Sequence, residues 1–308
     1  MKILVTGGAG YIGSELIRFL LDKNYTVDVI DNLMYEKTSL LRYAGDPNFS
    51  FKKADVRDKK ILAKHMEDAD VIIPLSALVG FPLCDDYPRD AKEINFEINK
   101  WIAENKRTDQ KVIYPCTNSG YGTSAGGICT EESPLNPVSL YGVTKVDAEK
   151  AFKSVDNHVT FRLATVYGPS SRMRADLLVN NFVWRAIKDR VLVLYECEFM
   201  RNYVHIHDVC RAFMFVLDNW EQCKNETYNV GNDSLNMNKL QLAEKISEYT
   251  PLEIIKAEFT SDPDVRDYEV SSQKIYDKGF SCLYDLDEGI RQLLNTYSII
   301  DSPWYGNY

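Results

Sequence analysis

The sequence predicts an α/β protein in which a doubly wound parallel sheet carries a second, smaller lobe of mixed α/β structure. Over the first half of the chain, short apolar segments alternate with segments of helical periodicity. A glycine-rich stretch separates the first apolar segment from the first helical one, and the alternation stops after about residue 168. Parallel strands need crossover connections, usually helices, so this alternation is typical of a parallel sheet covered on both faces.

The alternating elements occupy the first half of the chain. We expect strands at 2–6, 26–31, 51–54, 71–75, 112–116 and 159–163. We expect helices at 12–22, 58–66, 90–106 and 140–154. Helices therefore lie between most successive strands, which is the βαβ order of a doubly wound sheet.

The second half of the chain mixes its elements. After a loop we expect an amphipathic helix at 177–188, further helices at 208–219, 237–249 and 286–297, and strands at 191–195 and 227–230. No repeat or low-complexity linker separates the two halves. We therefore expect a first domain over residues 1–168 and a second lobe over residues 169–308, with an interleaved boundary.

Composition excludes several classes of function. The chain has 308 residues and a net charge of −9, so no basic face is expected for a nucleic-acid partner. Its seven cysteines are odd in number and lack metal-knuckle spacing, which argues against a disulfide framework and a metal site. No secretory pattern precedes the first strand, and no apolar run reaches membrane-spanning length. A cytoplasmic protein with reduced thiols and no membrane partner is expected.

The glycine-rich stretch has the spacing Gly8-x-Gly10-x-x-Gly13 and lies between a strand and a helix. The first glycine allows a tight turn, the second lets the backbone approach a pyrophosphate, and the third lets helix and strand pack closely. The second strand ends at Asp31, eighteen residues after Gly13, where a carboxylate would bind ribose hydroxyls and repel a 2′-phosphate. A simple strand-to-helix turn is the alternative, but this combination favours a Rossmann-type domain that binds NAD.

A second motif suggests proton chemistry. Tyr141 and Lys145 lie four residues apart on an expected helix, so their side chains share one face. An ammonium group and the positive nicotinamide ring would lower the pKa of the phenol from its usual value of about 10, which would make it a usable base. The stretch CTNSGYG, residues 116–122, follows the fifth strand and places a hydroxyl at the same edge of the sheet. Taken alone, Tyr-x-x-x-Lys would more often be an ordinary surface pair.

Together these motifs resemble the extended short-chain dehydrogenase/reductase family, in its nucleotide-sugar epimerase and dehydratase branch. The resemblance covers nearly the whole chain. Its motifs are TGGAGYIG (6–13), DNL (31–33), ADVRD (54–58), LSALVG (75–80), CTNSGYG (116–122), YGVTK (141–145), RLATVYGP (162–169), RNYVHIHDV (201–209) and YNVG (228–231).

The resemblance implies roles for individual residues. Tyr141 would be the base, Lys145 the ribose contact that tunes it, and Thr117 the hydroxyl partner. Residues implied to bind the cofactor are Gly7, Gly10, Tyr11, Ile12, Gly13, Asp31, Asn32, Asp55, Val56, Leu75, Ser76, Ala77, Asn95, Tyr141 and Lys145. Within that set, Asp55 and Val56 would lie beside the adenine.

Residues implied to bind the nucleotide-sugar substrate are Thr117, Asn118, Asn180, Asn181, Arg201 and Arg266. Asn180 or Asn181, together with the two arginines, matches positions that hold the substrate diphosphate, for which arginine supplies bidentate contacts. Either arginine taken singly would more often be a solvated charge. His205 and His207 are expected to be structural, with the pair 207–208 capping the helix that follows.

Departures from the family pattern narrow the expected chemistry. Dehydratases of this family carry an Asp-Glu pair where this chain has Asn118 and Ser119, and neither side chain can act as a general acid or base near neutral pH. Enzymes resembling UDP-galactose 4-epimerase carry a lysine where this chain has Val79. The stretch LVGFPLCD, residues 78–85, resembles bacterial enzymes that oxidise C4 of nucleotide-linked sugars, including GDP-heptose 4-dehydrogenases of capsule synthesis.

The expected function is therefore NAD-dependent oxidation at C4 of a nucleotide-linked sugar in surface polysaccharide synthesis. One alternative is a nucleotide-sugar 4-epimerase that re-reduces the ketone. An alternative of another class is a non-catalytic dinucleotide sensor, although such sensors tend to lose the Tyr-x-x-x-Lys pair. The resemblance also implies a homodimer that pairs through the helices expected at 90–106 and 140–154.

Overall fold

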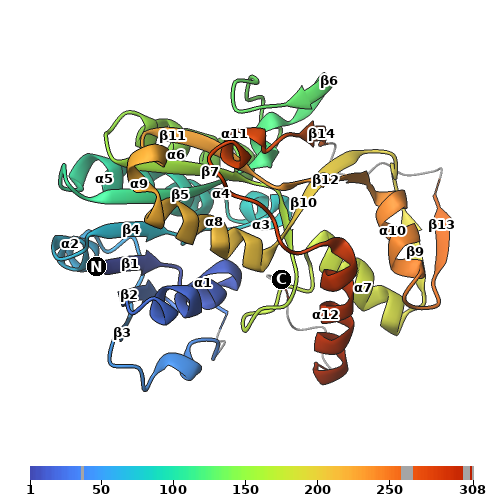
Figure 1. Ribbon diagram of the computed structural model, residues 1–308, viewed down its shortest axis with the longest axis horizontal. Helices are drawn as coiled ribbons and strands as arrows, with labels where there is room; N and C mark the ends of the chain where they lie inside the picture. The colour runs from blue at the N-terminus through green and yellow to red at the C-terminus, as the bar shows by residue number, and fades with distance from the viewer. Residues whose placement is uncertain (36–37, 258–265, 301–305, 307–308) are drawn as a thin grey trace.

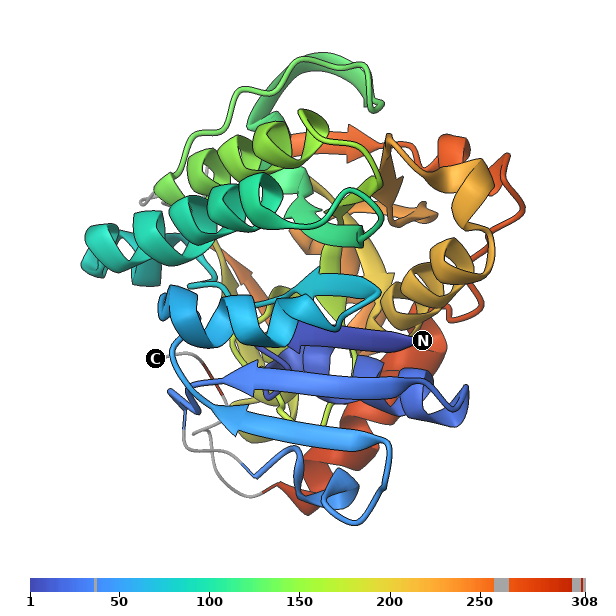
Figure 2. The same cartoon turned by 90° about the vertical axis from the view of Figure 1, so that its left-hand side faces the viewer.

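The computed structural model describes residues 1–35, 38–257, 266–300 and 306. Within these residues, a seven-stranded parallel sheet runs through the molecule in the order β11-β7-β5-β4-β1-β2-β3 (Figures 1 and 2). The strands are β1 (Lys2–Thr6), β2 (Thr26–Asp31), β3 (Phe49–Lys53), β4 (Val71–Pro74), β5 (Lys111–Thr117), β7 (His158–Leu163) and β11 (Glu226–Val230). Strand order reverses between β1 and β4, and ligands bind at such a switch point in open α/β sheets.

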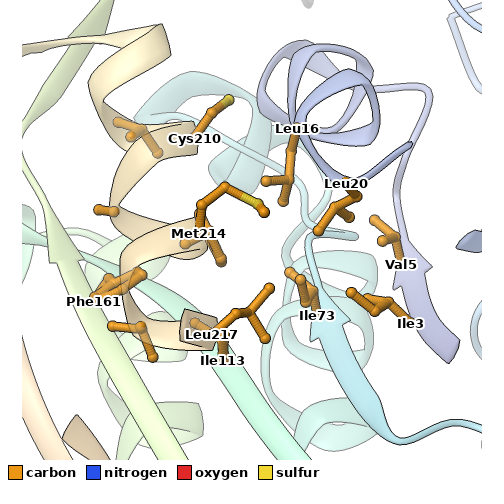
Figure 3. Close-up of a cluster of buried hydrophobic side chains, with 14 of the residues drawn as sticks. Ile3, Val5, Leu16, Leu20, Ile73, Ile113, Phe161, Cys210, Met214 and Leu217 are labelled. Atoms are coloured by element: carbon orange, nitrogen blue, oxygen red, sulfur yellow. The ribbon is translucent and has the colours of Figure 1, made fainter. Parts of the chain in front are cut away.

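Helices cover both faces of this sheet. On one face lie α1 (Tyr11–Asp22) and α8 (Ile206–Asp218); on the other lie α2 (Lys59–Glu67), α5 (Ile98–Asn105) and α6 (Leu140–Lys153). Side chains of β1 alternate between the two cores, because Ile3 and Val5 face α1 while Leu4 faces the other layer. Figure 3 shows the first core, in which Leu16 and Leu20 of α1 approach Met214 of α8 on the face of the sheet that carries Ile73 and Ile113.

The second lobe has a core of its own. It is built from α7 (Leu178–Lys188), α10 (Lys239–Ser247) and α12 (Leu286–Ile299), with the strand pair β9 (Val191–Leu194) and β13 (Glu253–Lys256). The sheet of β8 (Thr165–Tyr167), β10 (Met200–His205) and β12 (Asn232–Asn238) joins it to the first part. The strands β6 (Thr123–Cys129) and β14 (Asp267–Val270) form a separate pair. Although α8 and β11 come from beyond residue 168, they pack with the large sheet, and the domain division at that residue stays a prediction.

Most expected elements are present, and the differences have local causes. The helix expected at 90–106 consists of α4 (Pro88–Lys92), the π-helical segment η2 (Glu93–Glu97) and α5. The helix expected at 237–249 begins later, because Asn238 is its N-cap and forms a capping box with Gln241. The remaining short elements are η1 (Leu41–Tyr43), α3 (Phe81–Asp86), η3 (Asn118–Tyr121), α9 (Trp220–Cys223) and α11 (Gln273–Tyr276). None of the helices in the described residues is long and apolar enough to span a bilayer.

The core between α1 and α8 yields a stability prediction. Leu20 is fully buried there, so Leu20→Ala should lower the free energy of unfolding by about 2–5 kcal/mol through lost burial and a residual cavity. The control is Ile299→Ala at the end of α12, because Ile299 is 83% exposed. Urea titrations of both variants measure the difference. Equal stability of the two variants would contradict this packing.

Candidate active site

The loops that follow β1, β2, β4 and β5 surround a cavity of about 330 Å³. This volume is within the range of about 300–1,000 Å³ that is usual for small-molecule sites. The opposite wall comes from later in the chain and includes Arg172, Arg174 and Arg266. The cavity therefore lies between the large sheet and the second lobe, at the switch point of the strand order.

Nearly all residues predicted to bind the cofactor line this cavity. They are Gly7, Gly10, Tyr11, Ile12, Gly13, Asp31, Asn32, Asp55, Val56, Leu75, Ser76, Ala77, Tyr141 and Lys145. The exception is Asn95, which η2 buries behind the cavity wall. Its side chain accepts a hydrogen bond from Leu78 N (2.8 Å) and donates to Leu78 O (2.9 Å) and Thr144 Oγ1 (3.3 Å). Asn95 thus ties the loop after β4 to α6.

The turn between β1 and α1 requires bare backbone. Gly7 has a positive φ of 71°, and a Cβ there would lie 2.5 Å from Ser76 N. A Cβ on Gly13 would lie 2.7 Å from Gly8 Cα, so α1 can begin beside the strand only with glycine at that position. The sequence assigned the tight turn to Gly8; the structure assigns it to Gly7, because Gly8 instead packs against Val29 of β2.

The first turn of α1 and the end of β2 offer the groups that a dinucleotide needs. Within the described residues, no side-chain hydrogen bond caps α1 at Gly10, so its first amides can face an anion. The Asp31 carboxylate accepts hydrogen bonds from Ala9 N (3.0 Å) and Leu33 N (2.7 Å), which aim it along the cavity wall. Burial raises the pKa of Asp31, while these two amides and the charge of Arg172 oppose that rise. NAD therefore fits this part of the cavity.

The three predicted catalytic residues line the same cavity. Thr117 ends β5, and its hydroxyl donates to Ser119 Oγ (3.0 Å) and accepts from Ser119 N (3.1 Å). Tyr141 and Lys145 lie in the first two turns of α6, which is capped by the hydroxyl of Ser139. The Lys145 ammonium lies 4.2 Å from the ring centroid of Tyr114, a buried cation–π contact.

The ionisation of this pair differs from the expectation. Burial raises the pKa of Tyr141 above its ordinary value, although the charges of Arg266 and Arg174 partly oppose the rise. Burial also lowers the pKa of Lys145 to about 8. The protein alone therefore does not lower the pKa of Tyr141, since the cavity wall solvates neither a phenolate nor an ammonium well. The predicted lowering stays a prediction for the protein with NAD bound. The positive nicotinamide ring of NAD is the charge that can reverse the direction.

Two predicted substrate residues, Thr117 and Arg266, line the cavity. The Arg266 guanidinium contacts Ser119 Oγ. Asn118 is almost fully buried next to Thr117. Arg201 is buried one step behind Arg266: it donates to the backbone oxygen of Arg266, and its guanidinium carbon lies 5.6 Å from the ring centroid of Tyr268.

The two asparagines of α7 bond within the protein. Asn180 is fully buried and bonds to Tyr11, Gly168 and Arg174. Asn181 donates to Ala175 O (3.2 Å). These bonds occupy side-chain groups that the sequence analysis had assigned to a diphosphate.

Sequence reasoning missed several residues of the cavity wall. Arg172 and Arg174 lie three and five residues after the end of the RLATVYGP motif, and the sequence assigned them no role. The available signal was the pair of arginines two residues apart in a loop that follows a strand end. Tyr35 also lines the cavity, and the guanidinium carbon of Arg172 lies 4.5 Å from its ring centroid.

The histidines are structural, but the predicted cap is wrong. Helix α8 begins at Ile206, so His205 is its N-cap, and its Nδ1 accepts from His207 N (3.2 Å). Asp208 instead accepts hydrogen bonds from the backbone of 283–284. Among the described residues, no group of three His, Cys, Asp or Glu side chains is placed to hold a metal ion.

Residues 3–231 match the model of the NAD dependent epimerase/dehydratase family. The chain belongs to this family. The low-salt glycan biosynthesis protein Agl12 of Haloferax volcanii is 28% identical over 96% of this chain and 98% of its own length. YtcB of Bacillus subtilis, an uncharacterized UDP-glucose epimerase, is 30% identical over 75% of this chain and 77% of its own. The solved UDP-glucuronic acid 4-epimerase of Bacillus cereus is 25% identical and superposes with a TM-score of 0.84, over 97% of this chain and 99% of that one.

Family membership confirms the predicted α/β fold, the resemblance to the extended short-chain dehydrogenase/reductase family, and NAD as cofactor. It also confirms an NAD-dependent enzyme rather than a non-catalytic sensor. The members that resemble this chain include both nucleotide-sugar epimerases and dehydratases.

Asp31 should set the choice between NAD and NADP. Its carboxylate would repel a 2′-phosphate, so Asp31→Ala should shift the ratio of the two affinities toward NADP by at least about tenfold, or roughly 1.4 kcal/mol. Asp22→Ala, which removes an exposed carboxylate at the end of α1, is the control. Titration of each protein with both cofactors measures the ratio. Equal affinity of the native protein for NAD and NADP would overturn the assignment.

Proposed function

We propose that this protein oxidises C4 of a nucleotide-linked sugar with NAD and returns the hydride to C4, acting as a nucleotide-sugar 4-epimerase in glycan synthesis. One observation carries the proposal: a single cavity is lined by Thr117, Tyr141 and Lys145 and by the residues of the glycine turn and Asp31. Relatives that are named as epimerases support the return of the hydride to C4.

Each catalytic residue has a role that its position supports. The Tyr141 phenolate would accept the proton of the C4 hydroxyl while the C4–H electron pair leaves as hydride, so that a C4 ketone forms. Thr117 would hydrogen-bond the same oxygen, and Lys145 would hold the ribose and favour the phenolate. NAD supplies the hydride acceptor when bound. Returning the hydride to the other face of C4, with the proton from Tyr141, inverts that carbon.

The residues beside Thr117 argue against dehydration. Elimination of water needs carboxyl groups that move further protons, and Asn118 and Ser119 have none. Arg266 contacts Ser119, which places a permanent cation where a dehydratase would need a general acid. Dehydratase relatives are therefore poorer guides to this chain than epimerase relatives.

We infer that Arg266 binds the substrate diphosphate. It lines the cavity, and Arg201 supports it from behind through its backbone oxygen. Arg174 lines the same wall, but the carboxylate of Asp176 holds it through Nε (2.7 and 2.9 Å). A guanidinium in this wall can contact a phosphate through two parallel N–H donors.

Release of the ketone is the second candidate outcome, as in a nucleotide-sugar 4-dehydrogenase that could act on GDP-heptose. The resemblance at 78–85 favours it, because Val79, Gly80 and Phe81 of that stretch line the cavity. A panel of UDP-, dTDP- and GDP-sugars separates the outcomes. An epimerised product without net NADH indicates the epimerase, and a keto sugar with stoichiometric NADH indicates the dehydrogenase.

Tyr141→Phe tests the base. The change removes the proton acceptor and leaves the ring, so turnover should fall by about 10²–10⁴-fold. NAD affinity should stay near that of the native protein, because the pyrophosphate would lie on the glycine turn and the first turn of α1. Rate measurements at saturating NAD, with a parallel NAD titration, give both numbers. Near-native turnover would show that the proton leaves by another route.

We also propose a homodimer that pairs through α5 and α6, as the sequence analysis expected. Both helices pack on the same face of the large sheet, and Val143 of α6 is 39% exposed. Sedimentation should give twice the monomer mass at micromolar protein. Val143→Glu should shift the equilibrium toward monomer, whereas Ile299→Glu on α12 should not. A native protein that sediments only as monomer would contradict the dimer.

A further inference from the structure

The hydroxyl of Tyr11 joins the glycine turn to the second lobe. Tyr11 opens α1, and its buried hydroxyl donates to Gly168 O (2.7 Å). Asn180 of α7 donates to the same hydroxyl (3.2 Å). The hydroxyl thus contacts Gly168 and Asn180, which lie 157 and 169 residues further along the chain.

Asn180 completes this junction. Its Oδ1 accepts from Gly168 N (3.0 Å), and its Nδ2 also donates to Arg174 O (2.9 Å). Its own backbone oxygen accepts from the hydroxyl of Tyr297 (2.9 Å), which anchors α7 to α12. One fully buried amide therefore holds both ends of the segment 168–174.

The rest of that segment lies on the first turns of α1. Ser170 donates to Tyr11 O (2.8 Å), and its hydroxyl lies 3.0 Å from Ser14 Oγ. Ser171 donates to Glu15 Oε1 through both its amide and its hydroxyl (2.9 Å each). Burial would raise the pKa of Glu15, but His207, whose Nε2 lies 3.6 Å from Glu15 Oε2, and hydrogen bonds from Ser171 lower it to about 2. Glu15 is therefore a charged acceptor at neutral pH.

The segment carries two cations to the cavity. Arg172 and Arg174 both line the cavity. The Arg172 amide also donates to Ser14 Oγ of α1 (3.3 Å). Because Asn180 holds the Arg174 backbone and Tyr11 bonds to Asn180, the position of the backbone that carries these arginines depends on the first turn of α1. That turn is also where a pyrophosphate would bind.

We propose that Tyr11 and Asn180 act as positioning residues that couple NAD binding at the glycine turn to the arrangement of segment 168–174. NAD would order the first turn of α1, and the Tyr11 hydroxyl would pass that order to Gly168 and Asn180. The protein loaded with NAD would then present Arg172 and Arg174 to an anionic second ligand, so NAD and that ligand would each strengthen the binding of the other. The identity of that second ligand rests on the proposed function, whereas the link from NAD to the segment does not.

Hydrogen exchange measures the link directly. In the native protein, NAD should slow exchange in segment 168–182, including the Gly168 amide that donates to Asn180, and in the turn at 7–13. In Tyr11→Phe, NAD should still protect the turn, but its effect on 168–182 should fall to near zero. If the hydroxyl only stabilised the fold, its removal would speed exchange in 168–182 equally with and without NAD.

Matched controls are present in the chain. Tyr43 also places a buried hydroxyl on α1, where it donates to Ser14 O (2.7 Å), so Tyr43→Phe should keep the NAD effect on 168–182. Asn181→Ala should keep it, and Asn180→Ala should lose it. The same loss in Tyr43→Phe, or a native NAD effect retained in Tyr11→Phe, would overturn the proposal.

A second measurement separates this proposal from the proposed function. UDP should bind the native protein more tightly with saturating NAD than without it, by a factor in the range of about 5–150 that is usual for coupled sites. Tyr11→Phe should bring that factor close to one. If no nucleotide sugar is converted while NAD still protects 168–182, the coupling stands and the reaction assignment fails. If NAD protects only the turn at 7–13 in the native protein, the coupling itself is wrong.

Discussion

The bare backbone at the end of β1 is the constraint on which the rest of the site depends. Gly7 turns with a positive φ against the Ser76 amide, and Gly13 lets α1 start almost in contact with the strand. Only this start leaves the first amides of α1 facing the cavity. It also points Tyr11 toward the second lobe, where its hydroxyl meets Gly168 and Asn180.

The buried polar groups around the cavity are of two kinds. Some form their hydrogen bonds within the protein, and others can bond to a ligand. Asn95, Asn180 and Arg201 form hydrogen bonds within the chain, so burying them costs little and they hold other parts in place. Tyr141 and Lys145 instead carry shifted pKa values, because burial disfavours the charged form of each. The positive charge and the ribose hydroxyls of a bound dinucleotide would oppose both pKa shifts, which would link proton chemistry to cofactor binding.

Several predicted ligands turned out to lie behind the cavity wall. An asparagine that binds a phosphate and one that bonds to a backbone oxygen have the same sequence signature, since both need a polar side chain at a particular position. Asn180 shows this clearly: it matched a ligand position, yet its amide holds the segment that carries Arg174. Arg174 itself lay outside every matched motif and was missed, although its place on the wall follows once α7 is docked.

The sequence by itself determined the parallel sheet and the glycine turn, because each depends on local signals. It also predicted the cofactor-binding and catalytic residues that line the cavity, and their roles stay predictions. The local signals are the alternation of apolar segments, the spacing of the glycines and the i,i+4 pair. Each reflects structure formed by residues that are near neighbours in the chain. Only the tertiary structure decided that Gly7 makes the turn and that burial raises the pKa of Tyr141. It alone also showed that the Tyr11 hydroxyl contacts Gly168 and Asn180, which lie more than 150 positions away in the chain. Those outcomes depend on which surfaces pack together across the cavity, and no local pattern records that.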